Sequence, residues 1–184
     1  MSSTSEHWDQ IYTTRAIDSL SWFEAAPDLS LELVQTDGTP ASVIDVGAGE
    51  SLLADALAAL GVSDITLLDL SSAALDAVRA RVAPHSITTI CADVLGWEPD
   101  RTWQVWHDRA VFHFLTEPAQ RTSYVERAAT AVEPGGIAVI ATFAPDGPTM
   151  CSGLDVRRAD ARSIWTPRRQ LLSASTYSPL AEAV

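Results

Sequence analysis

The sequence predicts an α/β fold built on a doubly wound, mostly parallel sheet. Short apolar runs that are typical of buried strands alternate with helix-forming segments, and the connections between them are short. The predicted strands span residues 43–46, 64–69, 87–91, 103–107 and 136–142. The predicted helices between them span residues 52–60, 73–82 and 117–132. In the usual order of such a sheet the first and fourth strands are neighbours, so a ligand site is expected beyond their carboxyl ends.

Length and charge limit the function classes. The 184 residues fit one domain, and the net charge of −12 opposes binding to nucleic acid or to an anionic membrane. No apolar run approaches the roughly 20 residues that a membrane span needs, and no signal-like segment begins the chain. Cys91 and Cys151 form no CxxC pair, and no paired ligand spacing indicates a metal. We expect a reduced, cytoplasmic protein without metal, nucleic acid or membrane partners.

A glycine turn follows the first strand directly. Gly47 and Gly49 lack a Cβ atom, so the backbone can turn sharply and a ligand can approach it closely. A dinucleotide fingerprint would need glycine at position 52, where the chain has Leu52, and Glu50 would repel a phosphate at the helix start. A nicotinamide oxidoreductase is therefore a weak alternative. S-adenosylmethionine (SAM) fits better, because it carries a cationic sulfonium and no phosphate, and Asp45 is a candidate partner for its amino group.

Four segments in register resemble the motifs of class I SAM-dependent methyltransferases. They are the glycine turn with its strand, the acid-ended second strand 67–70, the segment 90–94 and the turn 132–136. The sequence of residues 106–116 resembles that of a small bacterial methyltransferase-domain family of unassigned substrate. The resemblance implies that Asp69 binds the ribose hydroxyls and that Asp93 meets the adenine amino group. The SAM-binding residues that it implies are Asp45, Gly47, Ala48, Gly49, Asp69, Leu70, Asp93, Val94 and His107.

The resemblance also implies a lid. Residues 7–12 are expected to form a helix with Trp8 and Tyr12 on one face, four residues apart. In the resembled family an N-terminal helix covers the SAM site, which places a lid at about residues 6–35 of a core that spans 1–154. The alternative is that the two aromatic rings only pack on the core of the domain.

Candidate acceptor-side residues end the fourth strand. Methyl transfer is an in-line displacement in which the protein mainly aligns the reactants, and only a protonated acceptor needs a base. His107 is the first candidate for that base because an imidazole titrates near pH 6.5, and Asp108 could orient it. Arg109 could hold a substrate carboxylate, although Asp108 and Arg109 could also form a structural pair. His113 lies in an apolar run and is the second choice, because a buried core histidine is commoner there.

The chain departs from the resembled pattern after residue 154. Such enzymes end in a helix and an antiparallel strand pair, but residues 155–184 show no apolar alternation and contain five of the twelve arginines. We predict an atypical tail, not a separate domain, with the strand pair missing or altered. One hypothesis is a truncated remnant that exposes the edge of the fifth strand and favours a homodimer. The other is a basic tail that binds an acidic substrate or partner.

The predicted function is methyl transfer from SAM to a small-molecule acceptor, with S-adenosylhomocysteine (SAH) as product. A carboxylate is one candidate acceptor. A protein-lysine or N-terminal methyltransferase is the nearest alternative, because the motifs constrain the cofactor and leave the acceptor open. A catalytically impaired SAM-binding protein is a second alternative, because the tail is atypical.

Overall fold

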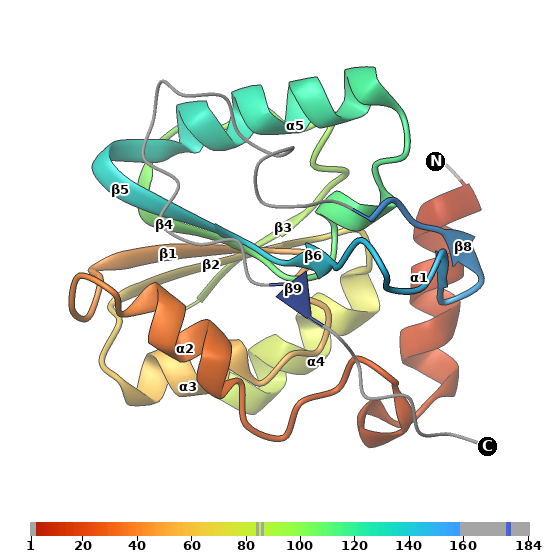
Figure 1. Cartoon of the computed structure of the whole chain (residues 1–184). Coiled ribbons are helices and arrows are strands. Elements are labelled where there is room, and N and C mark those ends of the chain that lie inside the picture. The colour runs from red at the N-terminus through yellow and green to blue at the C-terminus, as the bar shows by residue number, and fades with distance from the viewer. Residues whose placement is uncertain (1–2, 84, 86, 159–175, 178–184) are drawn as a thin grey trace.

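A sheet of five parallel strands forms the centre of the molecule. The computed structural model describes residues 3–83, 85, 87–158 and 176–177. The strands follow the order β3-β2-β1-β4-β5 (Figure 1). They are β1 (Ser42–Val46), β2 (Asp64–Asp69), β3 (Ile87–Cys91), β4 (Trp103–Asp108) and β5 (Val132–Ile140). The predicted doubly wound sheet is confirmed, and β1 and β4 are neighbours as expected.

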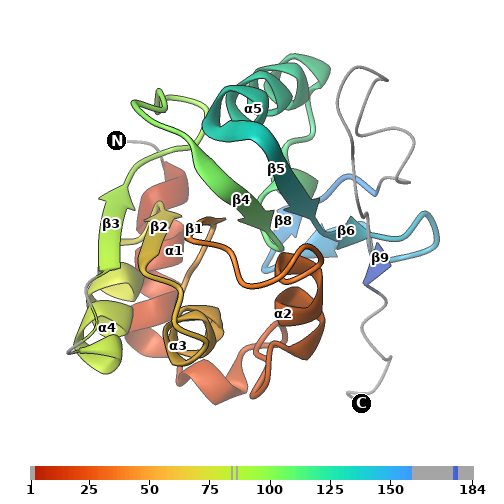
Figure 2. The ribbon, with the colours of Figure 1, turned by 90° about the vertical axis from the view of Figure 1, so that its left-hand side faces the viewer.

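Helices cover both faces of this sheet. The helix α5 lies on one face, and α2, α3 and α4 lie on the other (Figure 2). The helix α1 stands across the end of the sheet at which the strands finish (Figure 1). The helices are α1 (Ser3–Thr14), α2 (Asp28–Val34), α3 (Leu53–Ala59), α4 (Ser72–Val82) and α5 (Pro118–Ala131), with 3₁₀ turns η1 (Ile17–Ser19) and η2 (Phe112–Phe114). Within the described ranges, no helix has the length and apolar character that a membrane crossing requires.

The central strands are apolar because both of their faces are covered. Along β1, Val43 faces the core under α2, α3 and α4, whereas Ile44 and Val46 face the core under α5. Trp103 is buried in the core under α5, and its indole N–H donates a hydrogen bond to Thr66 Oγ1 at 3.0 Å. This burial on both faces explains the continuous apolar runs that predicted the strands.

The fifth strand begins earlier than expected. Residues 132–136 were predicted as a turn, but β5 begins at Val132, which pairs with Trp103. The next pairing joins Val105 to Ile137, so the register shifts between these two pairs. The turn-like glycines and proline therefore form an irregular start to the strand, and regular pairing resumes at the apolar residues.

Short strands follow the main sheet. The pair β7 (Met150–Cys151) and β8 (Leu154–Asp155) forms an antiparallel hairpin, and β6 (Thr142–Phe143) pairs in parallel with β9 (Thr176–Tyr177). Of the predicted tail, only 155–158 and 176–177 belong to the described residues. There Arg157 donates its backbone N–H to the carbonyl of His113 at 2.7 Å, which ties the end of the hairpin to η2.

A buried polar chain crosses the core under α5. The indole of Trp106 donates to the Tyr124 hydroxyl at 2.8 Å, and that hydroxyl donates to Asp108 Oδ2. All three side chains are fully buried. Burial raises the pKa of the Tyr124 hydroxyl well above its usual value, so the group stays a donor to the carboxylate. The chain joins α5 to the end of β4, where the loop toward η2 begins.

Replacing Tyr124 with Phe should therefore destabilise the fold. The variant leaves the Trp106 N–H and one carboxylate oxygen without this partner, which we expect to lower the free energy of unfolding by about 1–3 kcal/mol. Urea denaturation measures the change. The matched control is Thr122→Ala on the exposed face of the same helix, which should stay within about 0.5 kcal/mol of wild type. Equal stability of Y124F and wild type would contradict this role.

Candidate functional site

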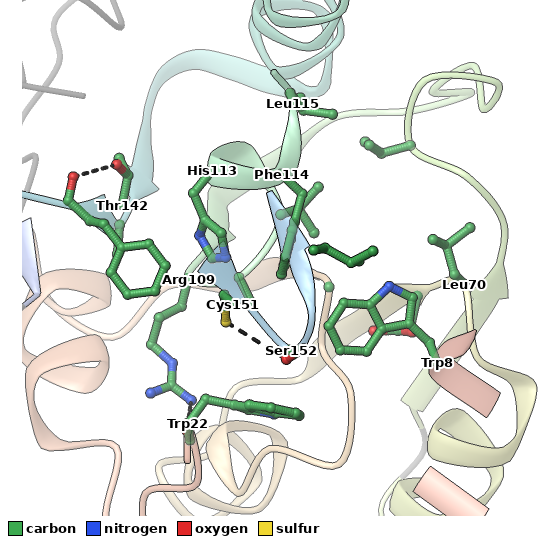
Figure 3. A pocket seen from close by; sticks show the side chains of 18 of the residues that line it. Trp8, Trp22, Leu70, Arg109, His113, Phe114, Leu115, Thr142, Cys151 and Ser152 are labelled. Carbon is green, nitrogen blue, oxygen red and sulfur yellow. Dashed lines mark hydrogen bonds between the residues drawn. The ribbon is translucent and has the colours of Figure 1, made fainter. Parts of the chain in front are cut away.

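A cavity of about 480 Å³ opens beyond the carboxyl ends of the strands (Figure 3). It lies at the reversal of strand order between β1 and β4, where open α/β sheets bind ligands. The segments that follow β1, β2 and β3 line one half of it, and η2, the residues after β5 and the β7–β8 hairpin line the other. The helix α1 contributes Trp8 and Tyr12 to its wall.

The glycine turn is shaped by close contacts on two sides. Gly47 and Gly49 adopt φ values of +69° and +50°, which few other residues tolerate. A Cβ atom at Gly47 would lie 2.3 Å from Val111 Cγ2, and one at Gly49 would lie 2.3 Å from the Tyr12 hydroxyl oxygen. The turn therefore needs glycine both for its conformation and for the approach of the lid helix.

Asp69 holds the glycine turn in place. Its carboxylate accepts the Gly49 N–H and the Ser71 N–H, each at 2.8 Å, and the residue is only 7% exposed. Burial raises the pKa of Asp69 to about 6, and the nearby Asp45 charge acts in the same direction. Asp69 lies in the cavity lining, as the sequence predicts for a ribose-binding acid.

The third strand contributes a turn to the same half of the cavity. Asp93 Oδ1 accepts the Leu95 N–H at 2.9 Å, and Asp93 is exposed at the cavity wall. Val94 is buried beside it, and Leu70 follows Asp69 in the lining. The structure thus brings Asp69, Leu70, Asp93 and Val94 together around one end of the cavity.

The helix α1, which the sequence predicts as a lid, is attached at both sides of the cavity. Asp9 accepts a hydrogen bond from the Ser71 hydroxyl at 2.6 Å, and His7 Nε2 lies 3.1 Å from the carbonyl oxygen of Ser152. Between these attachments Trp8 stacks with Tyr12 and meets Phe114 edge-on at a centroid distance of 5.4 Å. The structure therefore places the two aromatic residues of α1 over the cavity.

His107 lies away from the large cavity. Its Nδ1 is 2.7 Å from Asp45 Oδ1, its Nε2 is 3.0 Å from Ser30 Oγ, and all three side chains are buried. Asp45 and His107 line only a small cavity of about 40 Å³ on the other side of the glycine turn. Both ring nitrogens of His107 therefore have partners within the protein. Ala48 lines the same small cavity.

Asp108 organises the loop that follows β4. Its carboxylate accepts the backbone N–H groups of Ala110, Val111 and Phe112, and the residue is 0% exposed. Burial raises the pKa of Asp108 to about 6, although these donors act in the opposite direction. Asp108 lines neither the large nor the small cavity, and the His107 ring nitrogens bond to Asp45 and Ser30 instead of to Asp108.

Arg109 lines both cavities but already has an anionic partner. Its guanidinium is 2.8 Å from Glu24 Oε1 and donates to the Trp22 carbonyl oxygen at 3.0 Å. The ion pair joins the end of β4 to the segment between α1 and α2. Sequence reasoning missed Glu24, which lies 85 positions from its partner and carries no local signal beyond its charge.

His113 is a buried polar side chain in the second half of the cavity lining, which also contains Gln120, Thr142, Cys151 and Ser152. It is 5% exposed, its Nε2 has no hydrogen-bond partner among the described residues, and its ring points into the cavity (Figure 3). Burial lowers the pKa of His113 to about 4, so the imidazole is neutral at pH 7. Phe114 and Phe143 contact the ring at 4.3 and 4.8 Å between centroids. Neither Phe143 nor the hairpin was predicted to line the site.

Comparison with known proteins agrees with this geometry. The sequence profile of a methyltransferase-domain family matches residues 43–136, which is 94 of the 184 residues. The chain therefore belongs to this family, and the resemblance found in its motifs is confirmed. A search of curated proteins finds no match. Among the described residues, no group of three or more His, Cys, Asp or Glu side chains could hold a metal ion.

Solved structures show the same fold. The N-methyltransferase NodS from Bradyrhizobium japonicum WM9, in complex with SAH, matches with a TM-score of 0.62 and 16% identity over 72% of this chain. DhpI, in a complex with SAM and HEP, matches with a TM-score of 0.61 and 17% identity over 73%. A structure from work on the conversion of a disulfide bond into a thioacetal group in echinomycin biosynthesis matches with a TM-score of 0.65 and 24% identity over 79%. The matches cover 71%, 63% and 63% of those chains, respectively.

A substitution at Gly49 tests the contact between the glycine turn and the lid. Gly49→Ala combines an unfavourable φ with a clash against the Tyr12 hydroxyl, and should lower the free energy of unfolding by about 2–4 kcal/mol. Gly61→Ala is the control, because Gly61 has φ +83° but no atom within 4 Å of the added Cβ. Adding Tyr12→Phe should recover part of the loss at Gly49 and none at Gly61. Equal losses at the two glycines in urea denaturation would show that the lid does not press on the turn.

Proposed function

We propose that this chain transfers a methyl group from SAM to a small-molecule acceptor. The observation that carries the proposal is the cavity of about 480 Å³ at the strand-order reversal, with a glycine turn and two acids in one half and a largely apolar wall in the other. Membership of the methyltransferase-domain family supports the reaction class. The bound SAM or SAH of several structural neighbours supports the choice of cofactor.

The first half of the cavity fits SAM. The Asp69 carboxylate already accepts backbone N–H groups, but two carboxylate oxygens have about four acceptor sites, so it can still accept ribose hydroxyls. Asp93 would accept from the adenine amino group, with Leu70 and Val94 against the ring. The glycine turn allows the ligand to reach the backbone. When bound, SAM supplies an electrophilic methyl group on a cationic sulfur, which the acidic surroundings favour.

The protein contributes mainly alignment and exclusion of water. The lid aromatics and the hairpin cover the cavity, and His7 and Ser152 join these two segments directly. A volume of about 480 Å³ lies toward the lower end of the roughly 300–1,000 Å³ of small-molecule sites, and cofactor and acceptor must share it. A small acceptor therefore fits better than a protein side chain or terminus, which would need an open groove.

The polar residues behind the cavity hold its walls. We assign positioning roles to Asp45 and His107, which link β1, β4 and α2, and to Asp108, which shapes the loop toward η2. Arg109 is assigned to the lid connection through Glu24. Its charge is thereby compensated, which weakens the case for a carboxylate acceptor. A cytoplasmic location and a homodimer through the outer edge of β5 stay predictions.

Calorimetric titration with SAM and with NAD tests the cofactor. We expect saturable SAM binding, no NAD binding, and at least a tenfold loss of SAM affinity in Asp69→Ala, because the ribose hydroxyls lose their acceptor. Asp64→Ala is the matched control, since Asp64 begins the same strand at the opposite end of the sheet. No SAM binding by the folded wild-type chain would overturn the proposal. SAM binding without methyl transfer to any acceptor would instead indicate the impaired SAM-binding alternative.

The raised pKa of Asp69 predicts opposite effects of acid on binding and on folding. The ionised carboxylate accepts the ribose hydroxyls, so SAM affinity should fall as the pH drops through about 6. The folded state holds the Asp69 proton more tightly than the unfolded chain does. The stability that this proton contributes is therefore complete below pH 3.8 and lost as the pH rises through about 6.

Calorimetry and urea denaturation between pH 5 and pH 7 measure the two effects. Asp69→Asn cannot ionise, so it should bind SAM weakly at every pH and show a flatter stability profile. Asp108 also has a raised pKa and should keep part of the stability slope in this variant. SAM affinity that stays constant from pH 7 to pH 5 in the wild type would argue against ribose binding by Asp69.

A further inference from the structure

The glycine turn is open at one glycine and covered at the other. Gly47 borders both cavities, whereas Gly49 is buried and borders neither. The cover is the Tyr12 side chain of α1. Its hydroxyl oxygen lies 2.3 Å, and its Cζ atom 3.0 Å, from the position that a Cβ atom would take at Gly49. The space that a glycine leaves for a ligand is therefore filled here by a side chain of the protein itself.

Tyr12 also forms part of the partition between the two cavities. It lines both of them, together with Trp22, Gly47, Arg109 and Ala110. The smaller cavity, of about 40 Å³, has room for a few water molecules at most. Within this structure, the segment that follows β1 thus offers a ligand a large space on one side of Tyr12 and almost none on the other.

The far side of the partition carries acids that suit one end of SAM. The cofactor has an ammonium group and a carboxylate at the end opposite its adenine ring. Asp45 and Glu50 border the smaller cavity and not the larger one, and either carboxylate could face the ammonium group. With the ribose at Asp69, as proposed above, this end of SAM extends along the glycine turn. The smaller cavity cannot hold it while Tyr12 covers Gly49.

Building on the methyltransferase function proposed above, we propose that Tyr12 is a plug that holds the SAM-free protein in an autoinhibited form. SAM binds after the Tyr12 side chain leaves Gly49, and the two cavities then form one continuous site. The fraction of molecules in this open form limits the apparent affinity, because the closed form does not bind. The plug thus acts on the cofactor, whatever the acceptor is.

The helix that carries the plug can leave without disturbing the core. Among residues 5–14 of α1, the buried residue is Ile11, and the others are half-buried or exposed. The polar attachments of α1 are the bond from Ser71 to Asp9 and the contact between His7 and the Ser152 carbonyl oxygen. Segments with so few buried contacts open far more often than the whole domain unfolds.

Stopped-flow mixing of the full chain with SAH tests the plug. SAH has no methyl group to transfer, and Trp8 and Trp22 line the large cavity, so that tryptophan fluorescence can report its binding (Figure 3). The observed rate is measured over rising SAH concentrations for wild type, Tyr12→Ala and Tyr12→Phe. Gln10→Ala is the matched control, because Gln10 is exposed on the same helix.

In wild type we expect the observed rate to level off at high SAH concentration, because the departure of Tyr12 becomes limiting. Tyr12→Ala should remove this limit and raise the association rate constant at least tenfold. Tyr12→Phe should lie between the two, and Gln10→Ala should match wild type. An unchanged association rate constant in Tyr12→Ala, or only a faster release of SAH, overturns the plug, because Tyr12 would then be an ordinary ligand contact.

Failure of the plug and failure of the methyltransferase function give different results. If wild type and Tyr12→Ala are both folded and neither binds SAH, both proposals are overturned. Binding by Tyr12→Ala alone supports both, since the plug is then closed in nearly all wild-type molecules. If Tyr12→Ala does not fold, Tyr12→Phe decides, because it keeps the ring and removes the hydroxyl that lies against Gly49. An association rate constant equal to that of wild type then overturns the plug.

Discussion

The site depends on one buried carboxylate, that of Asp69. It fixes the glycine turn through the Gly49 N–H and the start of α4 through the Ser71 N–H. The Ser71 hydroxyl caps α4 by accepting the Ala74 N–H at 3.2 Å and also donates to Asp9 of the lid helix. The end of β2, the glycine turn, the start of α4 and the helix α1 are thus joined through Asp69 and Ser71. The raised pKa of Asp69 is the cost of placing a charge at this junction.

Two further buried acids have a comparable structural role at the ends of β1 and β4. Asp45 is bonded to His107, and Asp108 accepts three backbone N–H groups and the Tyr124 hydroxyl. Asp108 satisfies donors that the loop after β4 leaves unpaired where regular sheet bonding stops, whereas Asp45 pairs with a side chain of the neighbouring strand β4. The polar cluster at the carboxyl ends of these strands therefore supports the cavity wall from behind.

Local patterns were enough to predict the fold. The strands β1 to β4 lie within one residue of the expected ranges, and the apolar runs of β1, β2 and β4 are buried on both faces. The glycine turn and Asp69 could be placed because strand ends in a parallel sheet meet at one edge. The meeting of strand ends at one edge of the sheet does not determine which way the His107 side chain points. Its direction depends on Ser30, which lies 77 positions away, and no sequence pattern links the two residues.

The second half of the cavity was the least predictable part for the same reason. Phe143 lies in β6 and Ser152 follows β7, and these two-residue strands are too short for an alternation of apolar and polar residues to predict them. Glu24 is recognised only through its contact with Arg109. The apolar run around His113 predicted burial correctly, but burial alone does not show that Nε2 lacks a partner. These contacts join residues from several distant segments, so they can be seen only in the folded structure.

The bond between His7 and the Ser152 carbonyl joins two surface segments that are 145 positions apart. Together with the Asp9–Ser71 bond it closes a ring of protein around whatever occupies the cavity. If the ring stays closed during the proposed reaction, it opens to admit reactants and to release the spent cofactor. Turnover would then be paced by how often α1 detaches, so the residues that set the speed of this protein would differ from those that choose its substrate.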